Sequence, residues 1–289
     1  MHVRPMTRDD IPAGLRLCRL SQWNQLEDDW RCFLDSPQGA GWLTEKDGDI
    51  VGTVAFLRYG PCFSWLSMML VDPRARLAGI GSRLLETALE ALADEPCVRL
   101  DATPSGEPLY RRHGFVPEYA LTRAKITVAA ERFWRSPERV RPMTPGDLAE
   151  VFARDREVFG ADRSALLASF YARAPELAWT ARNVAGDRPA GPTSLPGYCF
   201  GRPGYRCGQI GPIVAETPSV ASDLLSHCLA AQDGRALVVD APRLSPEWTQ
   251  WLESMGFEME RPFLRMGRGD NRHPGLPNLQ LAIAGPEFG

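Results

Sequence analysis

The chain has 289 residues, more than one hydrophobic core usually supports, so its length predicts two domains of ordinary size. Hydrophobic residues make up 44% of the sequence and charged residues 24%, a balance that is normal for a globular protein and excludes a chain dominated by disorder. A formal net charge of -3 gives no overall electrostatic reason to bind nucleic acid or an anionic membrane.

The N-terminal segment, MHVRPMTRDD, is charged from its start and lacks the apolar core of a signal peptide. No apolar run approaches the roughly 20 residues that a membrane-spanning helix requires. We therefore expect a cytoplasmic protein with no membrane partner. The seven cysteines are scattered without a C-x-x-C pair, and the four histidines are equally dispersed. This spacing argues against a disulfide scaffold and against a bound metal.

The sequence begins twice in the same way. Residues 3–11 read VRPMTRDDI and residues 140–148 read VRPMTPGDL. Each predicts a short strand, then a Thr that caps a helix with acids in its first turn. Such a repeat is typical of two copies of one domain. We predict a first domain at 1–128, a linker at 129–138 and a second domain at 139–289.

The hydrophobic pattern of the first copy switches between the helix and strand periods. An Asp47-Gly48 pair marks a hairpin turn inside it. In chain order we predict a helix to about Leu20, a helix holding Trp23 and Trp30, strands at 41–45, 50–59 and up to Val71, a helix to Asp94, a strand at 97–101, a short helix ending at Gly114 and an extended stretch at 116–128.

The stretch LVDPRARLAGIGSR, residues 70–83, predicts a strand, a glycine-bearing turn and a helix. The first amides of a helix have no intrahelical partner, and the helix dipole adds positive charge there, so an anion fits at this end. Gly79 and Gly81 remove side chains that would keep a phosphate away, and Arg76 adds a full charge. The turn therefore predicts a diphosphate-binding loop.

This turn has alternative interpretations. A P-loop is excluded because no Gly-x-x-x-x-Gly-Lys-Ser/Thr string exists. A dinucleotide fingerprint fits Gly79, Gly81 and Asp101, which lies 22 residues after Gly79, but its third position is Leu84 where Gly or Ala is needed. A nicotinamide-dependent oxidoreductase therefore stays an alternative, as does an ordinary turn with fortuitous glycines.

The string V-x-P-x-x-R-x-x-G-x-G, from Val71 to Gly81, resembles the acyl-CoA pyrophosphate loop of the GNAT superfamily, the Gcn5-related N-acetyltransferases. The string LYRRHGF, which ends at Phe115, resembles the Y-x-x-x-G-F pattern of the same superfamily. The resemblance implies that Tyr110 is the general acid, because a phenol with a pKa near 10 is protonated at neutral pH and can donate to a thiolate. It also implies an acyl-CoA site formed largely by main-chain groups of Met69, Leu70, Val71, Arg76, Leu77, Ala78, Gly79, Ile80, Gly81 and Ser82.

The segment before the first sheet is the candidate acceptor site. Its polar and aromatic residues could hold an amine, and its acids could supply a general base. The competing interpretations are a solvated helix face, a buried tryptophan stripe, and a base that acts through water. The candidates are Trp23, Asn24, Gln25, Glu27, Asp29 and Trp30, and a further acid, Asp28, lies between Glu27 and Asp29.

The second copy departs from the first at its key positions. Residues 208–215 and 219–231 occupy the places of the central strand and the following helix. The segment between them, Glu216-Thr217-Pro218, lacks the arginine and both glycines of the loop in the first copy. Leu252 stands four residues before Gly256, where the first copy has Tyr110 four residues before its glycine. These departures predict a domain that kept its fold and lost its chemistry.

Three smaller stretches carry weaker predictions. Asp155 and the FGADR string, 159–163, could close the acceptor cleft. Phe133 and Trp134 of the linker could pack between domains. The apolar run at 279–284 either adds a strand or docks on a domain surface.

Together these patterns predict an α/β (α+β) fold of two tandem GNAT-like domains, each a mixed, mostly antiparallel sheet flanked by helices. We expect an acetyl-CoA-dependent N-acetyltransferase that acts by direct attack, without a covalent enzyme intermediate, a metal or a nucleic-acid partner. The acceptor would be a primary amine of a small molecule, amino acid or peptide. A non-catalytic acyl-CoA-binding or scaffold protein is the first alternative. The sequence predicts neither the acceptor nor the oligomeric state.

Overall fold

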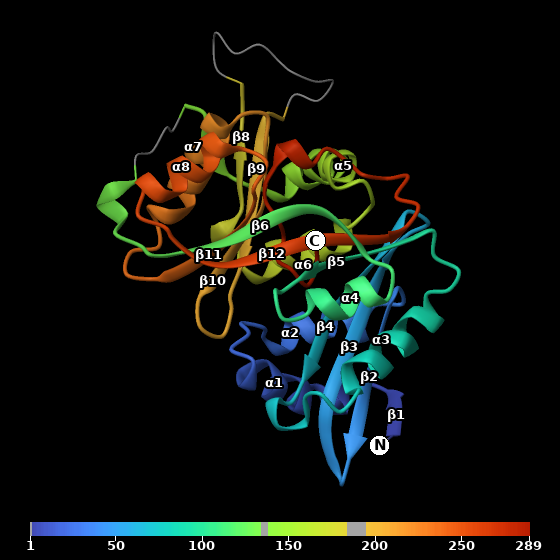
Figure 1. Cartoon of the computed structure of the whole chain (residues 1–289). Helices are drawn as coiled ribbons and strands as arrows, with labels where there is room; N and C mark the ends of the chain where they lie inside the picture. Colours follow the sequence, from blue (N-terminus) through green and yellow to red (C-terminus); the bar gives the residue numbers. More distant parts are fainter. Residues whose placement is uncertain (1, 134–137, 184–194) are drawn as a thin grey trace. The chain divides into compact units, whose positions relative to one another are not determined.

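The computed structural model describes residues 2–133, 138–183 and 195–289, which form two compact units (Figure 1). Unit 1 consists of Met1–Glu118, Arg265–Arg272 and Pro286–Gly289, and unit 2 consists of Tyr119–Leu264 and His273–Gly285. Each unit therefore takes segments from both sequence copies. The division of the sequence at 128 and 139 stays a prediction about the repeat. Trp134 lies outside the described residues, whereas Phe133 packs in a hydrophobic cluster of unit 2.

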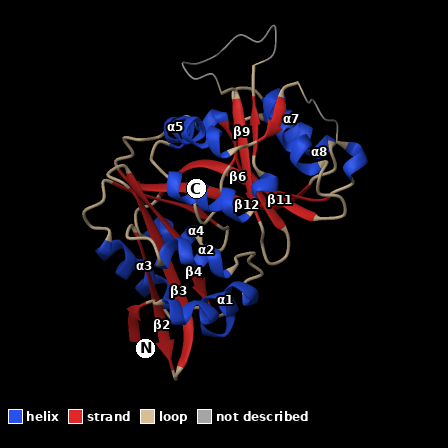
Figure 2. Ribbon diagram, turned by 180° about the vertical axis from the view of Figure 1, so that it is seen from behind, coloured by secondary structure: helices blue, strands red, loops and turns tan. Residues whose placement is uncertain are grey.

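Unit 1 is a mixed sheet in the strand order β1-β2-β3-β4-β5-β12. Strands β1 to β4 pair antiparallel, whereas β4 and β5 pair parallel. Helices α1 and α2 lie on one face of the sheet and α3 on the other (Figures 1 and 2). The elements are β1 (His2–Pro5), α1 (Ile11–Leu20), α2 (Glu27–Leu34), β2 (Gly39–Lys46), β3 (Asp49–Tyr59), β4 (Phe63–Val71), α3 (Ile80–Ala91), β5 (Cys97–Ala102), α4 (Glu107–Arg112) and the end of β12 (Glu258–Gly269).

Unit 2 contains a sheet in the order β12-β6-β11-β10-β9-β8-β7, with β13 paired to β10. Helix α5 lies on one side of β9, and α7 lies on the other (Figures 1 and 2). No helix among the described residues is both long and apolar enough to cross a bilayer. The elements are β6 (Val116–Thr127), β7 (Val140–Pro142), α5 (Leu148–Phe159), α6 (Ser164–Arg173), β8 (Trp179–Ala181), β9 (Gly197–Arg202), β10 (Gly208–Ala215), α7 (Pro218–Leu229), β11 (Ala236–Pro242), α8 (Pro246–Ser254), the start of β12, and β13 (Gln280–Ala282).

The repeated N-terminal motif forms the same structure in both units, which confirms the predicted repeat. In each, a Thr precedes a one-turn 3-10 helix, and a carboxylate three residues later accepts a hydrogen bond from the Thr amide. The same carboxylate holds an arginine of the preceding strand. The paired sets are Arg4, Thr7 and Asp10 in unit 1, and Arg141, Thr144 and Asp147 in unit 2.

The second predicted helix begins later than expected. Helix α2 starts at Glu27, so it holds Trp30 but leaves Trp23 in the preceding loop. The Asp29 carboxylate explains the start, because it accepts a hydrogen bond from the Leu26 amide at 2.7 Å and so caps the helix there. Two tryptophans seven residues apart therefore do not form one helical stripe.

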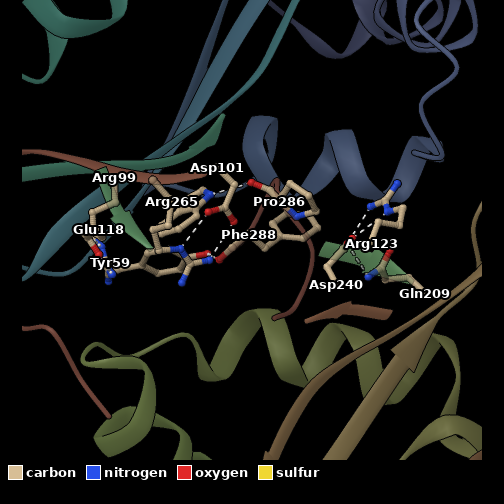
Figure 3. Close-up of polar contacts among 11 residues, drawn as sticks. Tyr59, Arg99, Asp101, Glu118, Arg123, Gln209, Asp240, Arg265, Pro286 and Phe288 are labelled. Carbon is tan, nitrogen blue, oxygen red and sulfur yellow. Dashed lines mark hydrogen bonds and ion pairs between the residues drawn. The ribbon is translucent and has the colours of Figure 1, made fainter. Parts of the chain in front are cut away.

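The last long strand of each copy is held by a buried ion pair (Figure 3). In unit 1, Arg265 of β12 makes a bidentate pair with Asp101 at the end of β5, at 2.8 and 2.9 Å. In unit 2, Arg123 of β6 pairs in the same way with Asp240 of β11, at 2.7 and 2.8 Å. Each unit thus completes its sheet with a strand from the other sequence copy.

Candidate active site

The predicted diphosphate loop of unit 1 is an exposed turn between β4 and α3. A one-turn 3-10 helix, Pro73–Ala75, follows β4 and is capped by the Asp72 carboxylate, which accepts the Arg74 amide at 2.9 Å. Leu77 and Gly79 then have positive φ angles of 64° and 76°. Leu77 is fully exposed, although its side chain is large and apolar. A positive φ is also uncommon at a residue other than glycine. Residues 76–79 of the loop are all exposed to solvent.

The start of α3 has no cap of its own. Its N-cap residue is Gly79, which offers no side-chain oxygen, so within the described ranges no side chain caps the first amides of the helix. Among the described residues, none accepts a hydrogen bond from the amides of Leu77 or Ala78 either, and none pairs with the Arg76 guanidinium. The loop therefore presents a cluster of donors beside one unpaired cation, which is an arrangement suited to a phosphate.

Strand β4 separates from β5 just before this loop. The parallel pairing of the two strands covers only Ser64 with Val98 and Trp65 with Arg99. Met68 then adopts a positive φ of 51°, and its carbonyl accepts a hydrogen bond from the Thr53 hydroxyl at 2.9 Å instead of continuing the ladder. The register of β4 against β3 shifts at the same place. The strand is therefore bulged, and its last residues diverge from β5.

The divergence leaves main-chain groups of β4 open on one side. Leu70 pairs with Thr53, and the Asp72 amide donates to the Val51 carbonyl at 2.8 Å, so these two positions face β3. Because main-chain groups alternate along a strand, those of Met69 and Val71 face the other way. Both residues are half-buried. Their amide and carbonyl groups therefore line the opening, and their contact with acyl-CoA stays a prediction.

Asp101 lies across this opening at the end of β5, and its side chain is not available there. The carboxylate has no exposed surface because it is paired with Arg265. The residue as a whole is half-buried, so its exposed atoms belong to the main chain. The nicotinamide alternative requires this carboxylate to accept a hydrogen bond from a ribose, and the buried ion pair occupies it.

Tyr110 lies in α4, close to the loop and to the end of β4. A methyl group placed on Gly81 would lie 3.4 Å from the Leu109 side chain and 3.8 Å from that of Val71, so α4, α3 and β4 meet here. Tyr110 is 8% exposed, and its ring packs edge-on against the Phe115 ring with 5.8 Å between the ring centroids. Burial raises the pKa of Tyr110 above its usual value, so the hydroxyl keeps its proton at neutral pH.

The candidate acceptor residues lie in the loop 22–26 and the first turn of α2. The Arg19 guanidinium donates to the carbonyls of Trp23 at 3.3 Å and Gln25 at 2.8 Å and so fixes the loop. Asn24 and Gln25 are buried, and within the described chain the Gln25 Oε1 atom has no hydrogen-bond partner. This loop is therefore the polar part of the candidate acceptor region.

The acids and the buried tryptophan of that region have structural contacts. Asp29 is fully buried and caps α2, while Glu27 is exposed and pairs with Arg31 at 2.6 Å. Trp30 is fully buried, where a methyl group on Gly14 would approach its ring to 2.8 Å. The geometry thus gives these three residues helix-capping, surface and core contacts, and it identifies no general base.

The C-terminal residues are part of unit 1, which the sequence did not predict. The Trp65 indole donates to the Pro286 carbonyl at 3.0 Å, and the Tyr59 hydroxyl donates to the Phe288 carbonyl at 2.8 Å (Figure 3). The Phe288 ring stacks on Phe33 at 5.4 Å. The only sequence signal near these residues was the apolar run at 279–284, which lies just before them.

Comparison with known families matches this chain twice. Models of the acetyltransferase (GNAT) domain match residues 37–117 and residues 151–276, one in each sequence copy. The chain belongs to the GNAT acetyltransferases. It carries two GNAT domains in tandem, and its mixed, mostly antiparallel sheets flanked by helices confirm the predicted fold class.

Similar proteins include one acyltransferase and two solved structures. The holothin acyltransferase of Pseudoalteromonas sp. (strain SANK 73390) is 28% identical, over 93% of this chain and 87% of that protein. The crystal structure of a putative acetyltransferase from Pyrococcus horikoshii has a TM-score of 0.80 at 21% identity and covers 100% of this chain and 95% of its own. A tandem GNAT protein from the clavulanic acid biosynthesis pathway has a TM-score of 0.61 at 16% identity, over 92% and 97% of the two chains. Both structures share the fold.

The second GNAT copy is built differently at the position of the loop. Helix α7 begins after Thr217, whose hydroxyl accepts a hydrogen bond from the Val220 amide at 3.3 Å. Its N-terminus is therefore capped from within. Leu252, at the position of Tyr110, is fully buried and offers no proton. The Asp155 carboxylate, a candidate for the acceptor cleft, is buried and holds Arg163 at 2.9 Å and the Tyr198 hydroxyl at 2.6 Å.

Proposed function

We propose that unit 1 is an acetyl-CoA-dependent N-acetyltransferase that transfers an acetyl group to a primary amine of a small molecule, amino acid or peptide. The observation that carries the proposal is the coincidence, in one unit, of an uncapped helix N-terminus with the open main chain of Met69 and Val71 and the buried residue Tyr110. A similar protein that is named for acyl transfer to holothin supports a transferase over a protein that only binds acyl-CoA.

The residues of unit 1 fit the parts of acetyl-CoA. The amides of residues 77–82 and the Arg76 guanidinium would hold the diphosphate, because they are unpaired donors at a helix N-terminus. The main-chain groups of Met69 and Val71 would hydrogen-bond the amides of the pantetheine arm and the acetyl carbonyl. A side chain at 79 or 81 would stand between these donors and the diphosphate.

Acetyl-CoA supplies the acetyl group as a thioester, which is activated toward an amine. In the proposed direct attack the amine nitrogen bonds to the carbonyl carbon, the carbon–sulfur bond breaks, and the amine loses a proton to water. Tyr110 donates its hydroxyl proton to the departing sulfur and regains a proton from solvent. The raised pKa of Tyr110 suits an acid that must stay protonated before it acts.

A thiol-release assay with Tyr110→Phe tests this role. The assay supplies acetyl-CoA with amino acids, polyamines, aminosugars and peptides as acceptors. We expect the wild-type chain to release thiol with at least one acceptor, and Tyr110→Phe to lower kcat about a hundredfold, in line with the loss of a general acid. The affinity for coenzyme A should not change, because the variant keeps the loop and the strand.

Tyr171→Phe is the matched control. It removes the same hydroxyl from unit 2, where Tyr171 donates to the Met143 carbonyl at 3.3 Å, and it should leave kcat unchanged. If the wild-type chain binds coenzyme A but releases thiol with no acceptor of the panel, the non-catalytic alternative is correct. If Tyr110→Phe keeps full activity, Tyr110 is not the acid.

A further inference from the structure

The two units contain equivalent strand pairs with the same register. Strand β10 pairs parallel with β11 at Gly208 with Leu237, as β4 pairs with β5 at Ser64 with Val98. The antiparallel pairings of β10 with β9 and of β4 with β3 also each shift register at a bulge. Counting along the strands from these pairs places Ile213 of unit 2 at the position of Met69, Ala215 at that of Val71, and Asp240 at that of Asp101.

In unit 2 the chain's own C-terminal segment lies along these positions. Strand β13 pairs antiparallel with β10, with Ala282 opposite Ile213. The next amide, that of Ile283, donates to the Asp240 carbonyl at 2.9 Å. On the α8 side the Trp248 indole donates to the Leu281 carbonyl at 2.9 Å. The segment therefore bonds to β10, β11 and α8 at once.

Burial distinguishes the two openings. Met69, Val71 and the main chain of Asp101 are partly exposed in unit 1. Their counterparts in unit 2 are covered, because Ile213 and Asp240 are both 0% exposed. Residues 280–285 are themselves buried throughout. The opening that unit 1 offers to solvent is thus filled in unit 2.

Glycine at position 211 makes this filling possible. A methyl group on Gly211 would lie 1.9 Å from the Ile283 carbonyl oxygen, a distance that no side chain tolerates. The tail backbone therefore lies directly against the β10 backbone at the bulge. Helix α7, which follows β10, is capped at its N-terminus by Thr217. It therefore offers fewer free amides to an anion than α3 does.

We infer that residues 280–284 are a built-in ligand of the second GNAT domain and occupy the groove that would otherwise take the pantetheine arm of acyl-CoA. The chemistry is the same in kind, since pantetheine carries two amides and a peptide strand offers the same donors and acceptors to an open strand edge. The comparison of grooves rests on the proposed acyl-CoA site of unit 1. It follows that one chain takes one molecule of acyl-CoA, in unit 1.

Amide hydrogen exchange of the full-length chain, with and without saturating coenzyme A, tests the inference. We expect the amides of 281–284 to exchange slowly in both conditions, and those of 77–82 to slow only when coenzyme A is added. Exchange of 281–284 at the rate of an unstructured peptide, or faster exchange on adding coenzyme A, would overturn the inference. If 77–82 do not respond while 281–284 stay protected, the proposed function fails: residues 280–284 still add to β10, but the comparison with pantetheine is overturned.

Trp248→Phe tests the contact directly. It keeps an aromatic ring but removes the donor to the Leu281 carbonyl, so exchange at 281–284 should accelerate about tenfold. Trp179→Phe is the control, because it removes an indole hydrogen bond to the Glu176 carbonyl elsewhere in unit 2 and should leave 281–284 unchanged. Equal acceleration in both variants would show general loosening and overturn the assignment of this contact.

Discussion

At the residue scale, one aspartate near the start of each unit has three polar contacts. Asp10 accepts hydrogen bonds from the Thr7 amide and hydroxyl, at 2.8 and 3.0 Å, and pairs with Arg4. The Arg4 guanidinium and the Thr7 donors lower the pKa of Asp10 from 3.8 to about 2. Asp147 has the equivalent partners in unit 2, Arg141 and Thr144, and its pKa is also lowered. The ionised carboxylate is therefore part of both folds.

This pKa shift predicts an acid-dependent loss of stability. The folded pKa of Asp10 lies below the unfolded value, so its contribution is complete above pH 4 and is lost as the pH falls toward 2. Asp10→Asn should lower the free energy of unfolding at pH 7 by about 1 kcal/mol, a value that allows for solvent screening at Arg4. Denaturant titrations from pH 7 to pH 2 should show this gap close. The exposed Asp9→Asn should show no gap, and a gap for Asp10→Asn that persists at pH 2 would contradict the prediction.

At the element scale, α3 and α7 hold the same place after the central strand but differ at their N-termini. The N-cap residue of α3 is a glycine, which has a positive φ and no side chain to cap the helix. Helix α7 starts at a threonine that accepts the Val220 amide. The same helix dipole therefore faces solvent with free donors in unit 1, whereas in unit 2 it is satisfied by the protein.

A pair of aspartate substitutions separates the two helices. Gly81→Asp, like Gly79→Asp, introduces bulk and negative charge among the donors and should abolish measurable binding of coenzyme A. Thr217→Asp keeps a capping oxygen at the start of α7 and should leave binding intact. Isothermal titration with coenzyme A measures both. Equal losses in the two variants would contradict one competent site in unit 1.

At the scale of the whole chain, each unit contains a segment from the far end of the sequence. Unit 1 contains the end of β12 and the last four residues, and unit 2 contains most of β6. Buried Arg–Asp pairs hold the exchanged strands, and Phe288 is fully buried in unit 1. Neither unit is therefore complete without both sequence copies.

The burial of Phe288 gives a prediction at this scale. Phe288→Ala removes the ring that stacks on Phe33 and should lower the stability of unit 1 by about 3 kcal/mol. Hydrogen exchange should then accelerate in β3 of unit 1 and not in β9 of unit 2. Phe263→Ala, which removes a buried ring from a small cluster in unit 2, should have the opposite pattern. Unchanged exchange in β3 of Phe288→Ala would show that the tail does not support unit 1.

Local patterns of the sequence determined much of the fold and part of the site. The Thr–Asp caps, the Asp47-Gly48 turn and the glycines of the α3 loop all depend on interactions between residues close in the chain. Such interactions can be read from spacing alone. The loop 70–83 was therefore predictable, and the family followed from it.

Only the tertiary structure decided which distant segments complete each unit. Asp101 was one candidate of the sequence for a ribose contact, and its partner Arg265 lies 164 residues away. The apolar run before the C-terminus was equally compatible with a strand or a docked segment until β10 fixed it as β13. No local pattern encodes these choices. A buried carboxylate or an open strand edge can pair with any segment of suitable chemistry, and the packing of the folded core determines which segment lies beside it.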